Sequence, residues 1–408
     1  MYLYRTQIGV KFIDKFTTKY KKVLSAMQYV VITSGYVLMT LVLWLLGRLA
    51  YVYTTSPTLA RDLRAPVLMP LIPYVDQIFK VDFLPPFYFT YWILIIAIIA
   101  IPHEFAHGIF ARFYKIKVHS TGFGFLGPFL AAFVEPDDKQ MEKKPKKAQL
   151  TVLASGTFAN VIFGVLSVIL LFIFVAAAFS PAGVYFNTYT YSPIALSEID
   201  NIGALNLSSP LLTEIKVNNQ TFLSYPNYIS ESMQKNVTHI FAYDDAPAIR
   251  SAMGGAIVFV NGVSTPSYAI LNSTLSKYSP GDNILVKTIS KNGTETNYNI
   301  TLASREGRPL LGIGIAEQQK SRLMSWLYNV VKAIKDPAIY YTSNMGEFGD
   351  FIYNLLWWCI MINFSVALFN MVPVGLFDGG RFFYLTVLGI TRNKKFAERA
   401  FAFMTYLF

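Results

Sequence analysis

Two histidines and a glutamate form the group of residues in this chain that is best suited to chemistry. They occur in the pentapeptide His103-Glu104-Phe105-Ala106-His107. Positions i and i+4 share one face of an α-helix, so both imidazoles can bind one metal ion. Glu104 could then serve as general base toward a water molecule at that metal. The pattern favours zinc and a hydrolytic reaction.

The pentapeptide lies at the end of an apolar run that begins near Pro86. Residues 90–101 contain no charged side chain, so the motif is predicted to lie in a transmembrane helix rather than in an aqueous cleft. Ionisable groups are costly in hydrocarbon and usually mark functional sites there. The alternative interpretation is a helix with two structurally satisfied histidines and an incidental glutamate.

A catalytic zinc site has three protein ligands and an open position, so a third ligand must come from elsewhere. Asp378 is the best candidate, because Pro373 and Gly375 would unwind the preceding helix and let a short carboxylate turn inward. An ordinary Asp-Gly turn at a helix end is the alternative. The poorer candidates lie in polar segments or across the membrane: Glu135, Asp137, Asp138, His119 and His239.

Composition places the chain among membrane proteins. Of its 408 residues 53% are apolar and 14% are charged, whereas soluble domains carry roughly a quarter charged residues. The net charge of +11 comes from lysines that cluster beside the apolar spans, as in loops on the cytosolic side. A nucleic-acid partner is therefore not expected. The single cysteine, Cys359, excludes an intrachain disulfide.

The apolar and basic segments predict a polytopic α-helical membrane protein with about four to six transmembrane helices and an inserted extracytoplasmic α+β domain. The expected parts follow one another along the chain: a basic cytosolic N-terminus (1–26), a first transmembrane helix (27–53), a first part of the catalytic membrane core (86–180), an extracytoplasmic region (181–345), and a second part of the core with the start of a last span (346–408). The first part of the core combines the histidine helix, a re-entrant loop or hairpin over 122–128, and a third span.

A multi-pass protein of the cell membrane is expected from this order, with the N-terminus and the active-site end on the cytosolic side. Residues 181–345 are expected outside the cell, in agreement with six Asn-x-Ser/Thr sequons. The sequons begin at Asn206, Asn219, Asn236, Asn272, Asn292 and Asn299.

Residues 240–316 have the pattern of a small β-rich domain. A strand over 256–260 leads into the turn pair Asn261-Gly262, and two further strands flank Asn292-Gly293, with helical spacing over 268–278. This order resembles a PDZ domain of the bacterial protease type, and such domains bind extended peptides by strand addition. A domain that only filters substrates sterically is the alternative. The preceding region, 187–238, resembles no family.

The combined motifs resemble the site-2 protease family of intramembrane zinc metalloproteases over residues 86–392. The step from Asn370 to Asp378 is similar to the family's Asn-Pro-Asp-Gly pattern, in which the aspartate is a zinc ligand and the asparagine lies by the active site. Gly156 and Asn160 are similar to its Gly-x-x-x-Asn motif, whose asparagine faces the site. The sequence departs from the family at Thr157, where proline is common, and at Phe377, which replaces leucine.

The resemblance implies regulated intramembrane proteolysis, the hydrolysis of peptide bonds within or near transmembrane segments of membrane-anchored substrates. Zn²⁺ would be held by His103, His107 and Asp378 while Glu104 acts as general base. Asn160 and Asn370 are the candidates for hydrogen bonds to the substrate backbone or the developing oxyanion. Two alternatives remain: a membrane scaffold braced by zinc, with an external peptide-binding domain, and a conventional zinc protease acting on soluble peptides.

Overall fold

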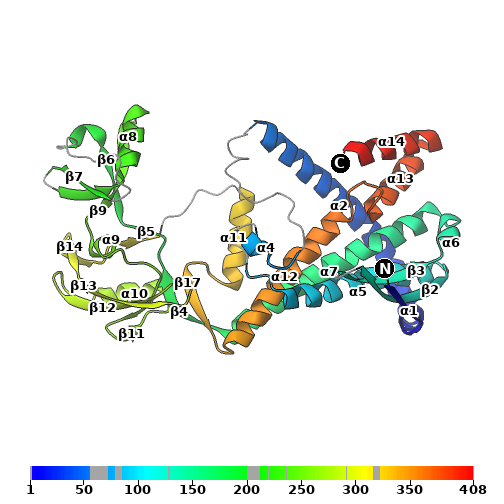
Figure 1. Cartoon of the computed structure of the whole chain (residues 1–408), viewed down its shortest axis with the longest axis horizontal. Helices are drawn as coiled ribbons and strands as arrows, with labels where there is room; N and C mark the ends of the chain where they lie inside the picture. The colour runs from blue at the N-terminus through cyan, green and yellow to red at the C-terminus, as the bar shows by residue number, and fades with distance from the viewer. Residues whose placement is uncertain are drawn as a thin grey trace. The chain divides into compact units, whose positions relative to one another are not determined.

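The computed structural model describes residues 2–55, 72–78, 85–126, 129–199, 212–218, 220–235, 237–290, 292–315 and 322–407. Contacts divide the chain into two compact units (Figure 1): unit 1 comprises Met1–Phe174 and Asp350–Phe408, and unit 2 comprises Val175–Gly349. Part of the expected membrane loop, Gly127 and Pro128, lies outside the described residues. So do the sequon asparagines Asn206, Asn219 and Asn236.

Four helices among the described residues are long and apolar enough to cross a membrane. They are α2 (Lys21–Thr55), α5 (Phe89–Phe113), α7 (Lys146–Ala178) and α12 (Glu347–Phe369). Each exceeds the roughly 20 residues that a hydrocarbon core requires. The surface of α7 carries an apolar stripe with helical spacing, formed by Ile162, Leu166, Ile169 and Ile173, all exposed in the isolated chain. Such a stripe is suited to contact with lipid.

The C-terminal segment forms two helices after α12. The structure has α13 (Asp378–Thr391) followed by α14 (Lys394–Leu407), with 14 residues in each. The start of a last span in this segment stays a prediction. Arg392 ends α13 with a positive φ of 54°, and this left-handed residue separates the two helices.

The segment after the histidine helix forms the expected hairpin, and the N-terminus adds to it. Strands β2 (Val118–Leu126) and β3 (Phe129–Pro136) pair antiparallel, and β1 (Tyr2–Thr6) pairs with β2, giving the order β1-β2-β3. The helix α1 (Ile8–Lys19) follows β1 and buries Val10 and Ile13 in the core of unit 1. The basic N-terminus is therefore a structural part of unit 1 rather than a simple solvated tail.

Replacing Gly122 by alanine is expected to detach β1 from the hairpin, because a Cβ on Gly122 would overlap the backbone oxygen of Tyr4. Amide hydrogen exchange over residues 2–6 should become faster in the variant, since those amides lose their strand partners. Gly47→Ala is the matched control, because nothing lies within 4 Å of the added methyl. Unchanged protection of β1 in Gly122→Ala would contradict the observed pairing.

The core of unit 1 holds the helices that carry the motifs. Phe382 of α13 and Ala154 of α7 are fully buried and pack with α2 in one apolar cluster. A Cβ at Gly35 of α2 would lie 2.9 Å from Ala154 and 3.0 Å from Phe382. The glycine therefore permits the close approach of three helices. This packing connects the first and second parts of the expected catalytic core, which are far apart in sequence.

Unit 2 contains a six-stranded antiparallel sheet. Its strands are β4 (Phe179–Tyr185), β10 (Ala256–Val260), β11 (Val263–Ser264), β12 (Asn283–Ile289), β13 (Glu295–Thr301) and β17 (Ile339–Ser343). The helix α10 (Tyr268–Leu275) lies between β11 and β12 in sequence. Asn261 and Gly262 both have positive φ, as a tight hairpin turn of this type requires. The expected strands and helix are present, whereas β4 and β17 were not anticipated. The PDZ assignment stays a prediction.

The region that resembles no family forms a second sheet with the order β6-β9-β8-β7. Its elements are β6 (Tyr191–Ala195), β7 (Thr213–Val217), β8 (Gln220–Ser224), the helix α8 (Pro226–Gln234) and β9 (His239–Asp244). One face of the sheet buries Ile194 and Ile240 against Ile229 of α8. Four short strands form two small pairs: β5 (Thr188–Tyr189) with β16 (Ile313–Gly314), and β14 (Ala303–Arg305) with β15 (Arg308–Leu310).

Candidate metal centre

The helix α5 presents its two histidines from one face. His103 and His107 are buried, with 8% and 9% of their surface exposed. Their Nε2 atoms lie 3.2 Å apart, which follows from the i and i+4 positions on a continuous helix. The pair is therefore arranged for one shared ligand or ion rather than for two separate partners.

Asp378 reaches this pair from a segment 271 positions further along the chain than His107. It is the first residue of α13, and its Oδ2 lies 3.3 Å from His107 Nε2 and 3.6 Å from His103 Nε2. The three ligand atoms lie within 4.8 Å of one another. Each side chain offers a donor atom that zinc accepts, so this group could bind a metal ion as the sequence predicted.

A compact turn between α12 and α13 directs Asp378 inward. The backbone N–H of Gly379 donates a hydrogen bond of 2.7 Å to the carbonyl of Asn370, at the start of the turn. A Cβ on Gly379 would overlap the backbone of Met371, and one on Gly380 would overlap the backbone of Val374. The two glycines therefore allow the chain to fold tightly onto itself directly after the carboxylate ligand.

The second ring nitrogen of each histidine has a partner that suits metal binding at Nε2. His107 Nδ1 lies 2.7 Å from the carbonyl oxygen of Val152, so Nδ1 carries the proton and donates it there. Beside His103 Nδ1, at 3.1 Å, lies the amide nitrogen of Asn160, while Asn160 Oδ1 is buried and has no hydrogen-bond partner among the described residues. Exchanging the amide oxygen and nitrogen lets Oδ1 accept the Nδ1–H of His103.

The buried Asn160 Oδ1 indicates whether the residues of this group fit a metal ion. With Oδ1 turned to His103, both Nδ1 atoms can donate a hydrogen bond, which leaves both Nε2 atoms for a metal ion at the point that Asp378 approaches. Metal-ligating histidines usually have such a second partner, which fixes the tautomer and the ring orientation. The donor set and its surroundings therefore fit zinc.

Two further residues shape the space around the ligand atoms. The Asn370 amide nitrogen lies 3.4 Å from His103 Nε2, so Asn370 is at the front of the group, the side to which the Nε2 atoms point. On the neighbouring helix, a Cβ added to Gly156 would overlap His107 Nε2 and lie 2.6 Å from His103 Nε2. Only a residue without a side chain leaves the space in front of the imidazoles open.

Glu104 lies beside the ligand group but is not part of the metal-ligand cluster. Its Oε2 accepts a hydrogen bond of 3.2 Å from the backbone N–H of Val134 in β3. The carboxylate also lies close enough to His107 to interact with it electrostatically. The hairpin therefore holds an ionisable group next to the metal-binding atoms without using it as a ligand.

The other acidic candidates for a third ligand have partners of their own. Glu135 accepts from the Ser120 hydroxyl at 2.7 Å and pairs with Arg5, and these two contacts hold the pKa of Glu135 below its usual value. Asp137 caps the short helix α6 (Asp138–Glu142) and pairs with His119. Among the described residues, neither of these carboxylates joins the metal-ligand group, and both take part in ion pairs.

Replacing Asn160 by alanine is expected to weaken zinc binding about 10- to 100-fold, because His103 loses the partner that orients it. Competition with a chromophoric chelator measures this affinity without reference to any activity. Asn363→Ala is the matched control: this asparagine is also buried, and it donates to the carbonyl of Cys359. Equal zinc affinities in wild type and Asn160→Ala would contradict the orienting contact.

The four apolar helices and the clustered His103, His107 and Asp378 together define a membrane protein with a candidate metal-binding site. The chain belongs to Peptidase family M50, the site-2 protease family. The sequence model of this family matches residues 91–408. Zinc is the metal of this family, and the His103/His107/Asp378 group could bind it.

Similar proteins come from bacteria and archaea. A Streptococcus pneumoniae protein named "Putative zinc metalloprotease" is 24% identical over 158 residues, which cover 34% of this chain and 37% of that protein. A Methanocaldococcus jannaschii protein without an assigned role is 26% identical over 292 residues, covering 71% of this chain and 55% of that protein. The chain thus spans between about a third and just over half of the length of these relatives.

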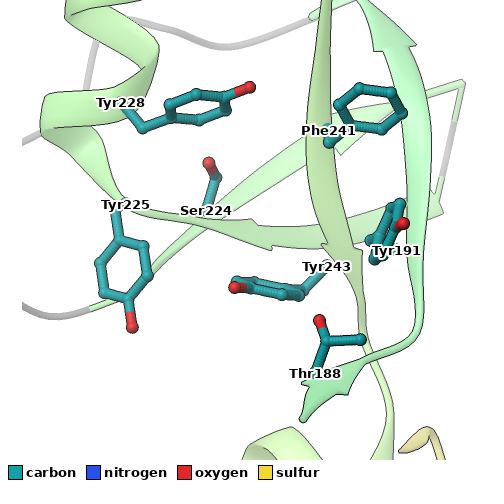
Figure 2. A pocket seen from close by; sticks show the side chains of 7 residues that line it. All are labelled: Thr188, Tyr191, Ser224, Tyr225, Tyr228, Phe241 and Tyr243. Atoms are coloured by element: carbon teal, nitrogen blue, oxygen red, sulfur yellow. The ribbon is translucent and has the colours of Figure 1, made fainter. Parts of the chain in front are cut away.

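Two surface hollows formed by described residues of unit 2 differ in character. One, of about 480 Å³, lies between α10 and residues 308–313. The other, of about 410 Å³, is lined mainly by aromatic rings from α8, β6 and β9 (Figure 2). Its seven lining residues are Thr188, Tyr191, Ser224, Tyr225, Tyr228, Phe241 and Tyr243. None of them is acidic or basic, so this second hollow suits a neutral partner rather than an ion.

Proposed function

We propose that this protein is an intramembrane zinc metalloprotease that hydrolyses peptide bonds within or near transmembrane segments of membrane-anchored proteins. The observation that carries the proposal is the convergence of His103, His107 and Asp378 at one point. Two of these ligands lie on α5, a helix long and apolar enough to span a bilayer. Membership of family M50 supports the same reading.

The proposed roles follow from the contacts of each side chain. When bound, zinc would acidify a water molecule and polarise the peptide carbonyl. Glu104 would take a proton as general base, and the Val134 N–H keeps its carboxylate in place. Asn370, at the front of the group, would donate its amide N–H to the developing oxyanion. Asn160 contacts His103 on the Nδ1 side, so we assign it to orienting the ligand rather than to contact with substrate.

Substrates are proposed to be membrane-anchored segments that unwind readily. A transmembrane helix hides its carbonyls in internal hydrogen bonds, and these must open before hydrolysis. Residues such as Gly, Pro and Asn near the cleavage point lower the cost of opening. Equal cleavage of segments built only from strong helix formers would contradict this part of the proposal.

The proposed topology places the N-terminus and the metal end of α5 on the cytosolic side and unit 2 outside the cell. The distribution of lysines supports it: Lys143 and Lys144 precede α7 and Lys146 and Lys147 are its first residues, whereas the opposite end of this helix leads into unit 2. In this arrangement unit 2 would select among the external portions of substrates.

The hollow beside α10 is the proposed site for an extended peptide in unit 2. It lies between a helix and the strand-forming segment Arg308–Ile313, and Leu271 and Leu311 supply apolar lining. A peptide could add to the sheet there while its side chains enter the hollow, as in strand-addition complexes. This location is consistent with the predicted PDZ-like domain, and steric filtering is the alternative role.

Three structural features favour an enzyme over a scaffold braced by zinc. The candidate cluster has three ligands, whereas structural zinc sites are usually four-coordinate. An additional carboxylate, Glu104, is held beside the cluster. Gly156 keeps the space in front of the histidines open. A conventional surface protease is disfavoured because its histidine helix would have to lie in water, whereas α5 is suited to lipid.

The test uses the full chain purified in detergent and a single-span substrate with Gly and Pro in its apolar segment. Cleavage within that segment should stop when a zinc chelator is added and return when zinc is restored. Mass spectrometry of the products locates the cleaved bond. Stoichiometric zinc binding without cleavage of any weakly helical substrate would favour the scaffold instead.

A further inference from the structure

The outer face of α1 combines large apolar side chains with lysines. Ile8 is 76% exposed and Phe12 is 54% exposed, one helical turn apart. Lys11, Lys15 and Lys19 are exposed at the same spacing of four residues. The opposite face packs into unit 1. One face of the amphipathic helix α1 is therefore buried in unit 1, while its apolar and basic face remains exposed.

The position of α1 in the chain puts this face next to the start of a candidate transmembrane helix. Only Tyr20 separates α1 from α2, whose first residues are Lys21 and Lys22. The continuous apolar sequence of α2 begins near Met27, so the start of α2 at Lys21 is within about 9 Å of the hydrocarbon region at 1.5 Å per helical residue. A helix at this depth lies in the headgroup layer.

The positive charges of this segment have no acidic partners among the described residues. No ion pair involves Lys11, Lys15, Lys19, Lys21 or Lys22 there. The single acidic residue of α1, Asp14, accepts two hydrogen bonds from Arg112, at 2.6 and 2.9 Å. Five ammonium groups are therefore available to an external anion.

We propose that α1 binds in the plane of the membrane to anionic phospholipid headgroups. Ile8 and Phe12 would enter the boundary between headgroups and acyl chains, while the lysines contact phosphate groups at the surface. A zwitterionic surface would satisfy only the apolar side chains. The clustering of five lysines beside a transmembrane helix is what selects an anionic lipid.

The same helix is attached to the helix that carries the metal ligands. A Cβ on Gly108, next to His107, would lie 2.7 Å from the Ile13 side chain, which shows how closely α1 packs on α5. The rings of Phe12 and Phe105 are 5.7 Å apart, and Asp14 joins α1 to Arg112. Anionic lipid bound at α1 would therefore stabilise the position of α5, whatever reaction the metal centre performs.

The experiment places a spin label at position 8 (Ile8→Cys) in the full chain in nanodiscs of phosphatidylcholine, with and without phosphatidylglycerol. Cys359 is buried, so labelling of the unsubstituted chain measures the background. Relative accessibility to oxygen and to a nickel chelate reports the depth of the label. We expect the label to be immersed and to move deeper when phosphatidylglycerol is present.

Two triple variants separate charge from apolar contact. Each lysine near an anionic surface contributes about fivefold in affinity, so Lys11→Gln/Lys15→Gln/Lys19→Gln should weaken the anionic preference on the order of 100-fold. Lys216→Gln/Lys235→Gln/Lys277→Gln makes the same change in net charge within unit 2 and should leave the label depth unchanged. A depth independent of phosphatidylglycerol would overturn the anionic preference, and a water-exposed label in both membranes would overturn the membrane contact itself.

Discussion

Glu104→Gln is expected to abolish cleavage of a membrane-anchored substrate while zinc remains bound. Glutamine keeps the shape of the side chain, and its amide oxygen can still accept from the Val134 N–H, but it cannot take a proton. Loss of a general base typically lowers the rate 10²- to 10⁴-fold. The measurement pairs single-turnover cleavage with metal content, so that a loss of activity is not confused with a loss of metal.

Glu135→Gln is the matched control for this prediction. Glu135 lies on β3 one residue from Val134, and its carboxylate pairs with Arg5 and Ser120 rather than with the metal cluster. The same chemical change there should leave the cleavage rate within about twofold of wild type, because surface ion pairs contribute little to stability. Cleavage that survives Glu104→Gln, or equal losses in both variants, would reject Glu104 as the base.

The metal-ligand group was predictable from sequence because its signals are local. The i and i+4 histidines require only a continuous helix, and the charge-free run before them identifies that helix as a span. Asp378 was identified through the neighbouring Pro373 and Gly375, which indicate a break between helices. The structure brings all three residues together. Proline and glycine, which have strong backbone preferences, thus indicated where the chain turns toward the histidines.

The contacts that hold the histidines and Glu104 in position were harder to predict. Asn160 was expected to face the substrate, but whether a helical side chain contacts a histidine or the space in front of it depends on the rotation of α7 relative to α5. That rotation is set by packing between helices, which one sequence does not specify. The contact of Val134 with Glu104 is equally non-local, since it involves a backbone N–H whose direction depends on strand register.

The elements that sequence analysis missed are short and paired with distant segments. The strand β1 has five residues, and its partner β2 begins more than a hundred residues later. The strands β4 and β17 extend the sheet of unit 2 from the segments next to α7 and α12. Strand preference depends on the neighbours that a segment finds, so such strands are poorly signalled by composition. Hairpins with Asn-Gly turns were located because their partners are adjacent in sequence.

Gly156→Ala is expected to eliminate high-affinity zinc binding, and with it any metal-dependent cleavage. The added methyl would overlap His107 Nε2 and lie 2.6 Å from His103 Nε2, the two atoms that would ligate the metal. The histidines cannot move away freely, because Val152 and Asn160 hold their opposite nitrogens. Displaced ligands lose the geometry that metal affinity depends on. Isothermal titration with zinc measures the loss directly.

Gly164→Ala tests whether this effect is specific to the metal centre. Gly164 lies on α7 two turns after Gly156, and the atoms nearest to its added methyl would be those of the Phe364 ring, at 3.1 Å. A single aromatic ring can shift by a few tenths of an ångström, and alanine favours the helix more than glycine does. Gly164→Ala should therefore bind zinc like wild type. Normal zinc affinity in Gly156→Ala would mean that the metal does not bind between these imidazoles and α7, and the proposed site would have to be abandoned.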